Sequence, residues 1–292
     1  MNLVLVDKLE VVRAKGPDEP FQAGSVSKSV AAFAALRLVD SGALELDQDV
    51  NERLVSWQLP DGEGVTLRRL LSHTAGLGVG FFPGYEGSGE LPTLVEVLDG
   101  TPPSVTDPVR VETPPGNGFR YSGGGYALVQ LLVEDVTGRP FAEVARELVF
   151  EPAGMASSTF EQRTGAWHHY PEQAAAGLWT TAADLARFVA VLQRDAEPMK
   201  TPAVDLPPEG EWSALAELGM AAPQQFGLGL FLLDGWFGHL GGAFGSFSAF
   251  FGSTEGGRGI VAWMPGGATP EFFLSVLAAA DERGWNGLRL RT

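Results

Sequence analysis

The chain has 292 residues, 45% of them hydrophobic and 19% charged, so it can bury a large core and is too apolar to be disordered throughout. Its 36 acidic and 20 basic side chains leave a net charge of −16, which repels phosphate backbones and argues against nucleic acid as a partner. The chain contains no cysteine, which excludes disulfides, thiolate nucleophiles and cysteine–zinc sites.

The N-terminal residues do not resemble a targeting signal. Residues 1–7 lack a basic n-region, and their apolar stretch is too short for a signal peptide. No apolar run approaches the ~18 residues that a membrane-spanning helix requires. We therefore expect a cytoplasmic protein without a membrane span, or a periplasmic or secreted one if a signal segment has been removed. The sequence predicts no particular oligomeric state.

The N-terminal part of the chain predicts strands followed by a buried helix. Residues 3–12 form two short apolar runs joined around Asp7-Lys8, a pattern typical of strands. Residues 30–39 are rich in alanine and apolar on nearly every helical face, as expected of a buried helix. Gly42 follows directly and is suited to end that helix in a left-handed conformation.

The middle of the chain predicts helices, and its C-terminal part predicts mainly strands. Helical patterns cover residues 66–72, 91–98, 126–136, 141–149 and 182–193, the last of them preceded by a capping Thr180-Thr181. Asp234-Gly235 predicts a hairpin turn, because strand-like residues 226–233 and 236–239 flank it. Further strands are expected at 243–251 and 260–264, before an amphipathic helix over 270–282.

This order of elements predicts an α+β fold in which one antiparallel sheet is built from both chain ends and flanked by helices. The sheet domain would comprise residues 1–43 and 175–292. Residues 44–174 would form an inserted all-helical domain. A binding site is expected in the cleft where the two parts meet.

Ser25 and Lys28 are the first candidates for chemistry. Their spacing puts both side chains on one helical face. Serine becomes a nucleophile only when a base takes its proton, and lysine can be that base if burial lowers its pKa. The alternative is a serine that caps the helix and a lysine that points into solvent. A solvated lysine fits poorly at the start of a helix with almost no polar face.

Two glycine-rich segments supply further candidates. Tyr121 opens a helix beside a run of glycines, where its phenol can relay protons at a cleft edge, although a purely structural aromatic would look the same. His239 lies in a stretch where a substrate backbone can approach closely, and it can donate to a substrate carboxylate or to Tyr121. The Gly242 and Ser25 amides can pair as an oxyanion hole. The alternative for this segment is a β-bulge with a surface histidine.

The motifs Ser-x-x-Lys, Tyr-Ser-x and His-x-Gly, in this order, resemble those of the serine β-lactamase and penicillin-binding protein superfamily. The likeness is greatest to the class C β-lactamase branch, with its D-Ala-D-Ala peptidases and family VIII carboxylesterases. It spans about residues 21–265 and includes matching phrases at 70–77, 176–181 and 183–185. His73, in the first phrase, is expected to be hydrogen-bonded inside the helical domain.

The resemblance implies a role for each motif residue. Ser25 would be acylated, and Lys28 would accept its proton or activate the tyrosine. Tyr121 would be the base for water and the acid for the leaving group. His239 stands where the third motif usually has lysine, and Gly242 would give the second oxyanion donor.

The resemblance also implies substrate contacts at Gly123, Gly241 and Ala243. Gly123 stands where β-lactamases of this branch have an asparagine that binds the acylamino side chain of the antibiotic. The loss of that amide, together with the many aromatic residues, favours a carboxylesterase acting on small apolar acyl esters through a covalent acyl-enzyme. The alternatives are a β-lactamase or D-Ala-D-Ala carboxypeptidase, and a non-hydrolytic penicillin-recognising sensor or scaffold.

We expect a small-molecule ester or amide as the partner, and neither a cofactor nor a metal. His168-His169 is the one histidine pair, and no other ligand lies at a recognisable metal-binding spacing. A surface loop is therefore the preferred interpretation of that pair.

Overall fold

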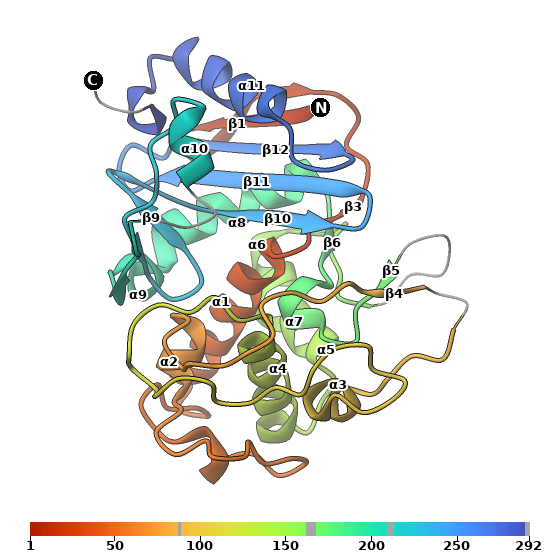
Figure 1. The fold of residues 1–292 in the computed structure, drawn as a ribbon. Coiled ribbons are helices and arrows are strands. Elements are labelled where there is room, and N and C mark those ends of the chain that lie inside the picture. Colours follow the sequence, from red (N-terminus) through yellow and green to blue (C-terminus); the bar gives the residue numbers. More distant parts are fainter. Residues whose placement is uncertain (87–88, 162–167, 209–212, 290–292) are drawn as a thin grey trace.

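The computed structural model describes residues 1–86, 89–161, 168–208 and 213–289. An antiparallel sheet fills one half of the molecule, and most of the helices fill the other (Figure 1). None of the helices in these ranges is long and apolar enough to cross a membrane. The predicted domain limits near residues 43 and 174 stay a prediction.

The main sheet is built from both ends of the chain. Within the described ranges it has eight strands in the order β2-β1-β12-β11-β10-β9-β8-β7. β1 pairs antiparallel with β12, which joins the N-terminal hairpin to the C-terminal strands and confirms the predicted α+β sheet. The strands are β1 (Asn2–Asp7), β2 (Glu10–Lys15), β7 (Val204–Asp205), β8 (Gln225–Phe226), β9 (Phe231–Leu233), β10 (Trp236–Ala243), β11 (Ser246–Ser253) and β12 (Gly259–Pro265).

Two smaller pairings and the helices complete the described chain. β3 (Phe21–Gln22) pairs with β6 (Trp179–Thr180), and β4 (Tyr85–Glu86) with β5 (His168–His169). The α-helices are α1 (Val26–Asp40), α2 (Leu67–Leu71), α3 (Leu94–Asp99), α4 (Gly123–Thr137), α5 (Phe141–Ala145), α6 (Glu151–Ala153), α7 (Gln173–Ala176), α8 (Ala182–Asp195), α9 (Glu197–Lys200), α10 (Ser213–Glu217) and α11 (Pro270–Asp281). The 3-10 helices are η1 (Val50–Glu52) and η3 (Asn286–Leu288), and η2 (Arg146–Phe150) is a π-helical turn.

The sheet has an apolar layer on each face, as the alternation of its strands requires. In β12, Val261 joins the core shared with α1 and α8, whereas Ile260 and Ala262 join the core shared with α11. α8 packs on strands β1, β11 and β12, and α11 covers the opposite face (Figure 1). Helix α1, buried along most of its length, therefore lies between the sheet and the helical half.

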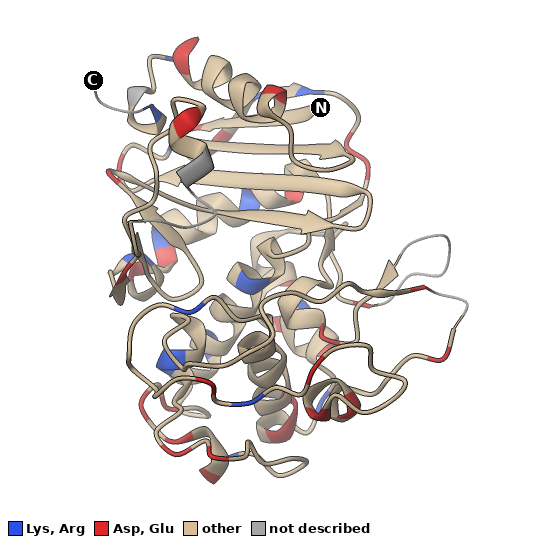
Figure 2. Ribbon diagram, viewed as in Figure 1, with Lys and Arg blue, Asp and Glu red and all other residues tan. Residues whose placement is uncertain are grey.

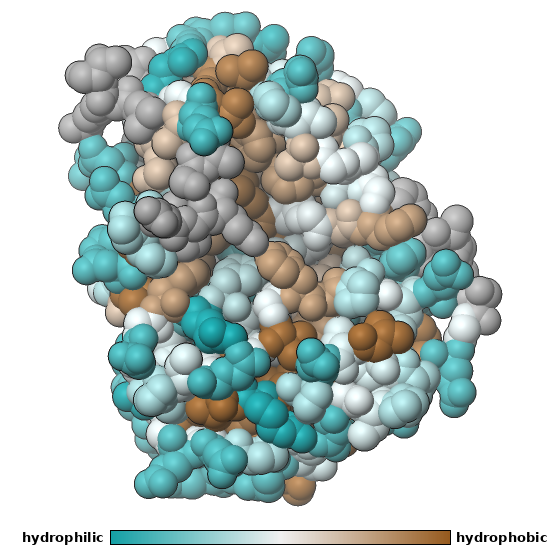
Figure 3. All heavy atoms as spheres, in the orientation of Figure 1, coloured by the Kyte–Doolittle hydropathy of each residue, from teal (hydrophilic) through white to brown (hydrophobic). Residues whose placement is uncertain are grey.

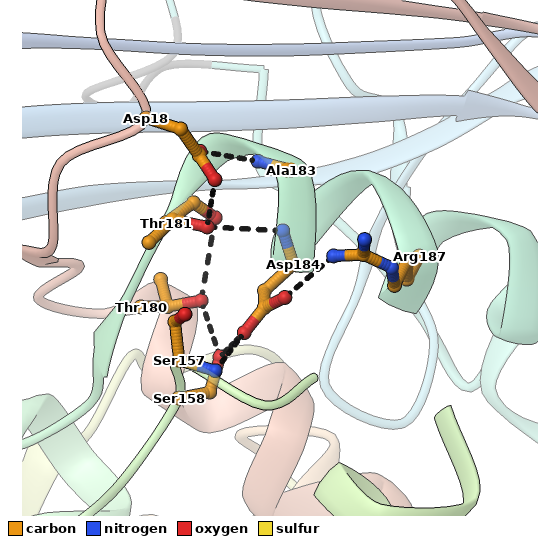
Figure 4. A network of polar contacts seen from close by, with 8 residues as sticks. All are labelled: Asp18, Ser157, Ser158, Thr180, Thr181, Ala183, Asp184 and Arg187. Carbon is orange, nitrogen blue, oxygen red and sulfur yellow. Dashed lines mark hydrogen bonds and ion pairs between the residues drawn. The ribbon is translucent and has the colours of Figure 1, made fainter. Parts of the chain in front are cut away.

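A polar network fastens the start of α8 to the helical half of the chain (Figure 4). Asp184, in the first turn of α8, is buried with 2% of its surface exposed. Its Oδ2 accepts from the Ser157 N–H at 2.8 Å and from the Ser158 hydroxyl at 2.9 Å. Its Oδ1 accepts from Arg187 at 2.7 Å. Both oxygens of this buried carboxylate are thus hydrogen-bonded, as a structural role demands.

Several predicted boundaries move where glycines are involved. The Asp234-Gly235 hairpin and the Thr181 cap of α8 are confirmed. The expected strand over 226–233 is instead two short strands, because the chain turns at Gly229 with φ of +82°. The strand expected to begin at 243 begins at 246, because the turn between β10 and β11 lies at Gly245 with φ of +75°.

Candidate active site

Ser25 lies at the N-terminus of α1, where the chain crosses directly over strand β10. Gly24 has φ of +54°, and a Cβ there would lie 2.2 Å from Gly242 O. A Cβ at Gly241 would lie 1.9 Å from Ala23 O. Only glycine allows these two backbones to pack so closely. The close approach brings Ser25 next to the backbone of Gly242.

Lys28 is held against Ser25. Its side chain is buried, and Nζ donates to Ser25 Oγ at 3.0 Å and to Ala175 O at 2.8 Å. Burial lowers the pKa of Lys28 to about 7, and the charge of Glu172 opposes that shift. The structure therefore brings the two predicted side chains together and excludes a solvated lysine. A large fraction of this amine is neutral near pH 7 and able to accept a proton.

Tyr121 lies beside the same amine. The Lys28 Nζ is 5.0 Å from the centre of the Tyr121 ring. That ring packs on His73 with centres 4.3 Å apart, and His73 Nδ1 accepts from the Ser122 N–H at 3.1 Å. His73 thus fixes the backbone next to Tyr121, and the hydrogen bond expected for His73 in the helical half is present. Tyr121 also packs near His239, with ring centres 6.4 Å apart.

His239 is a neutral, buried ring. Its Nδ1 lies 2.6 Å from Leu240 O, a group that can only accept, so Nδ1 carries the proton. Burial and the charge of Lys28 lower the pKa of His239 to about 3. Its Nε2 has no hydrogen-bond partner within the described chain. This nitrogen is therefore an acceptor, which corrects the expectation that His239 donates to a substrate carboxylate or to Tyr121.

A cavity of about 740 Å³ opens beside Ser25, a size typical of small-molecule sites. Its polar end holds Ser25 and Gly242, and Tyr121 and His239 are the titratable side chains among its described lining residues. Most of the remaining lining is apolar and includes residues from β9, β10, β11, α11 and the α10 region: Leu215, Leu218, Phe231, Leu233, Leu240, Phe247, Phe251 and Phe273. The cavity therefore pairs a reactive end with an apolar body.

The described residues that line this cavity include no Lys, Arg, Asp or Glu. Strands β10, β11 and β12 carry no Lys, Arg, Asp or Glu, as their tan ribbons show (Figure 2). Figure 3 shows apolar residues reaching the surface in the sheet half of the same view. The acidic net charge of the chain thus does not extend into the site.

The three expected substrate contacts stay a prediction. Gly123, Gly241 and Ala243 are not among the described residues that line the cavity. The Gly123 N–H donates to Gly80 O at 3.0 Å, and a Cβ at Gly123 would lie 2.9 Å from the same oxygen. Gly241 faces Ala23 O, as described above. These glycines make room for backbone packing around the site.

The sequence prediction missed Glu172, which precedes α7. Its side chain is fully buried, and neither carboxyl oxygen has a hydrogen-bond partner among the other described residues. Burial raises the pKa of Glu172 to about 8, and the residue's own backbone N–H and the charge of Lys28 oppose that shift. Glu172 stands just before an uncharged, alanine-rich stretch, and this pattern could have indicated a buried carboxyl group. The surface loop expected at His168-His169 is wrong in part, because β5 buries His169.

Comparison with known proteins settles the family. A model of the Beta-lactamase family matches residues 3–279. The chain belongs to the beta-lactamase family. It is 35% identical over 144 residues to penicillin-binding protein 4 of Amycolatopsis lactamdurans, which covers 48% of this chain and 36% of that protein. It is 33% identical over 164 residues to esterase EstB of Burkholderia gladioli, which covers 52% of this chain and 41% of that protein.

The chain thus spans well under half the length of either of these relatives. Its fold is similar to that of the octameric penicillin-binding protein homologue from Pyrococcus abyssi, with a TM-score of 0.76 and 23% identity. That likeness covers 97% of this chain and 73% of the other. The beta-lactamase family member described here therefore shares the fold across nearly its whole length.

Proposed function

We propose that this chain is a serine carboxylesterase that hydrolyses esters with apolar acyl groups through an acyl-enzyme at Ser25. The observation that carries the proposal is the 3.0 Å contact of Lys28 Nζ with Ser25 Oγ at the mouth of an apolar cavity. Nucleophile and base within hydrogen-bond reach are the signature of covalent catalysis. The similarity to an esterase agrees with this chemistry.

In the acylation step, neutral Lys28 takes the Ser25 proton as Oγ attacks the carbonyl carbon of the ester. The carbonyl electron pair moves to oxygen, and the Ser25 and Gly242 amides are the proposed donors to that oxyanion. When the carbonyl re-forms, the C–O bond to the alcohol breaks. The leaving alkoxide then takes a proton from Tyr121 or from the Lys28 ammonium, which leaves an acyl-Ser25 ester.

In the deacylation step, a water molecule attacks the acyl-Ser25 carbonyl. The Tyr121 and Lys28 pair accepts the proton of that water, and the Ser25 oxygen leaves and regains a proton. His239 contributes an acceptor, because its Nε2 lone pair is free while Nδ1 is bonded to Leu240 O. This acceptor suits a hydroxyl of Tyr121, of water or of the substrate better than a carboxylate.

The cavity lining favours esters over penicillins and D-peptides. An acylamino or peptide side chain needs polar partners when it is buried. The amide that would supply one in β-lactamases of this branch is replaced by Gly123, whose N–H is bonded to Gly80 O. An apolar acyl group has no such need and gains about 0.8 kcal/mol for each buried methylene.

Hydrolysis of p-nitrophenyl butyrate tests the proposal. We expect turnover by the wild-type chain well above the background of the Ser25→Ala variant. Equal rates for the two would overturn it. Nitrocefin is the matched second substrate, and sustained hydrolysis of nitrocefin without ester hydrolysis would instead indicate a β-lactamase. A penicillin adduct on Ser25 that persists without any turnover would indicate a sensor.

A further inference from the structure

The buried carboxyl of Glu172 has no part in the mechanism above, although it lies in the same core as the reactive amine. Its side chain is fully buried, and neither of its oxygens is hydrogen-bonded to another described residue. An unpartnered buried carboxyl is destabilising, so a chain that keeps one needs a reason. Because the charges of Glu172 and Lys28 influence each other, that reason can be electrostatic.

The backbone around Glu172 is fixed toward the site by two helices. α7 packs against both α1 and α4. From α4, the Gln130 side chain donates to Pro171 O at 3.0 Å and accepts from the Ala174 N–H at 3.2 Å. One helical position further, Ala175 O accepts from Lys28 Nζ at 2.8 Å. The segment that carries Glu172 therefore also binds the amine directly.

We propose that Glu172 is a positioning residue for catalysis: the charge of its buried carboxyl acts on the Lys28 amine and so sets the pH at which that amine can accept the Ser25 proton. It acts through Lys28 and does not line the substrate cavity. The proposal rests on Ser25 as the nucleophile and on no particular ester.

Several described groups face the Lys28 amine, and among them only Glu172 carries a carboxyl group. These groups are Tyr121, Tyr126, His73, His239 and Glu172. The two histidines have their pKa values lowered by burial and by the charge of Lys28, so they stay neutral. Only the Glu172 carboxylate can therefore balance an ammonium at this position.

This balance matters when Ser25 reacts. The Ser25 O–H bond breaks, an N–H bond forms on Lys28, and a positive charge appears in a buried place. If Glu172 is a carboxylate at that moment, its attraction stabilises the ammonium. If Glu172 is protonated instead, no carboxylate raises the pKa of Lys28, which then begins as the neutral amine that the step needs. A neutral amide at position 172 leaves Lys28 neutral but cannot stabilise the ammonium that forms when Ser25 reacts.

The test is the rate at which an uncharged fluorophosphonate labels Ser25, measured by intact mass between about pH 5 and 9. This rate reports activation of Ser25 without requiring turnover. For Glu172→Gln we expect the midpoint of the profile to fall by about 1 pH unit, because the attraction that raises the Lys28 pKa is lost. We expect the plateau rate to fall about tenfold, because the amine becomes a weaker base. Glu172→Asp, which keeps the charge, should give an intermediate midpoint.

Glu134→Gln is the matched control. Glu134 is a partly buried carboxyl on α4 whose pKa is also raised by burial, and its Oε1 accepts from the Phe141 N–H at 3.0 Å and from the Gln130 amide at 3.4 Å, bonds that the amide oxygen introduced by Glu134→Gln can keep. Its profile should match that of the wild type. An equal shift in Glu134→Gln would overturn the proposal, as would a wild-type midpoint in both Glu172 variants. If Glu172→Gln does not fold, the Glu172→Asp midpoint decides alone.

The two proposals fail in different ways. If wild-type Ser25 is not labelled at any pH, the nucleophile assignment fails and the role of Glu172 fails with it. If wild-type Ser25 is labelled and the midpoint does not respond to Glu172, only the positioning role is lost. If the labelling responds to Glu172 but no ester is hydrolysed, the positioning role stands without the proposed esterase.

Discussion

Two buried carboxyl groups in this molecule have opposite surroundings. Asp184 has both oxygens bonded to Ser157, Ser158 and Arg187, and it joins α8 to the helical half (Figure 4). Glu172 is buried at least as deeply, and neither of its oxygens has a partner among the other described residues. The hydrogen-bonded Asp184 stabilises the fold. In our proposal, the charge of Glu172 acts on Lys28 when that amine gains or loses a proton.

Buried polar groups in this molecule serve either structure or function, depending on their hydrogen bonding. A buried group with complete hydrogen bonding adds stability and specificity, and losing one partner is costly. A buried group without partners weakens the fold, and such groups gather where pKa values must be shifted for catalysis. His239 belongs to the second kind, because its Nε2 has no partner in the described structure. Substitutions in the two regions should therefore change different measurements.

The largest effect is expected for Lys28→Met, which removes the amine and keeps the side chain apolar and similar in length. We expect ester hydrolysis to fall by about 10³-fold, because Ser25 loses its base. The free energy of unfolding should not fall, because a buried charge is replaced by an apolar group. Urea unfolding and p-nitrophenyl butyrate hydrolysis measure the two quantities.

Lys200→Met is the control for that substitution. Lys200 is also largely buried, but its Nζ donates to Gln193 O at 3.0 Å and pairs with Glu197 on α9. Its activity should equal that of the wild type. If Lys28→Met keeps its activity, the buried groups around Lys28 are not catalytic, and they do not differ in role from the structural network of Asp184.

Asp184→Ala should produce the opposite pattern. Removing the carboxylate leaves the Ser157 N–H and the Ser158 hydroxyl without their acceptor, so we expect the free energy of unfolding to fall by about 3 kcal/mol. Activity per folded molecule should stay unchanged. Asp195→Ala is the control, since its exposed pair with Arg194 at 3.6 Å is worth well under about 1 kcal/mol. Lost activity without lost stability in Asp184→Ala would contradict this assignment.

The pH profile of the wild type should follow Lys28. Its pKa of about 7 means that the amine is protonated below that pH and neutral above it, so activity rises with pH. Between about pH 5 and 8 we expect kcat/KM to increase by about 100-fold and then to level off. His239, with its pKa of about 3, does not titrate in this range. A flat profile over the same range would contradict a base role for Lys28.

Asp18→Ala should have the smallest effect. Asp18 accepts from the Thr181 hydroxyl and from the Ala183 N–H, each at 3.1 Å, and so supports the start of α8 beside the Asp184 network (Figure 4). We expect the free energy of unfolding to fall by about 1 kcal/mol, the usual contribution of a helix cap. Thermal unfolding measures this change. A loss of stability as large as that of Asp184→Ala would contradict the expectation that the exposed Asp18 contributes less to stability than the buried Asp184.

Local patterns predicted the sheet and the reactive pair. The alternation of β12 and the turn at Asp234-Gly235 depend on neighbouring residues alone, so the hairpins and the helix cap at Thr181 follow from the sequence. Ser25 and Lys28 lie one helical turn apart, and the apolar helix predicted the burial that lowers the lysine pKa. Contacts between residues that are close in the sequence can be predicted from the local sequence.

Contacts between distant segments were not predictable. Lys28 meets Ala175 across 147 residues, and no local pattern indicates that α7 packs against α1. Glu172 was therefore missed. Gly241 was assigned to the substrate because a strand glycine permits any close approach, and only the structure shows that Ala23 O fills the space. Likewise, the proton on Nδ1 of His239 depends on Leu240 O at 2.6 Å.

The most direct test of the account is the site of fluorophosphonate modification at about pH 8, located by peptide mass spectrometry in the wild type and in Lys28→Met. We expect a single adduct on Ser25 in the wild type and a labelling rate at least about 10²-fold lower in the variant. An adduct on another residue, or equal labelling of Ser25 in both proteins, would contradict the claim that this amine activates this hydroxyl.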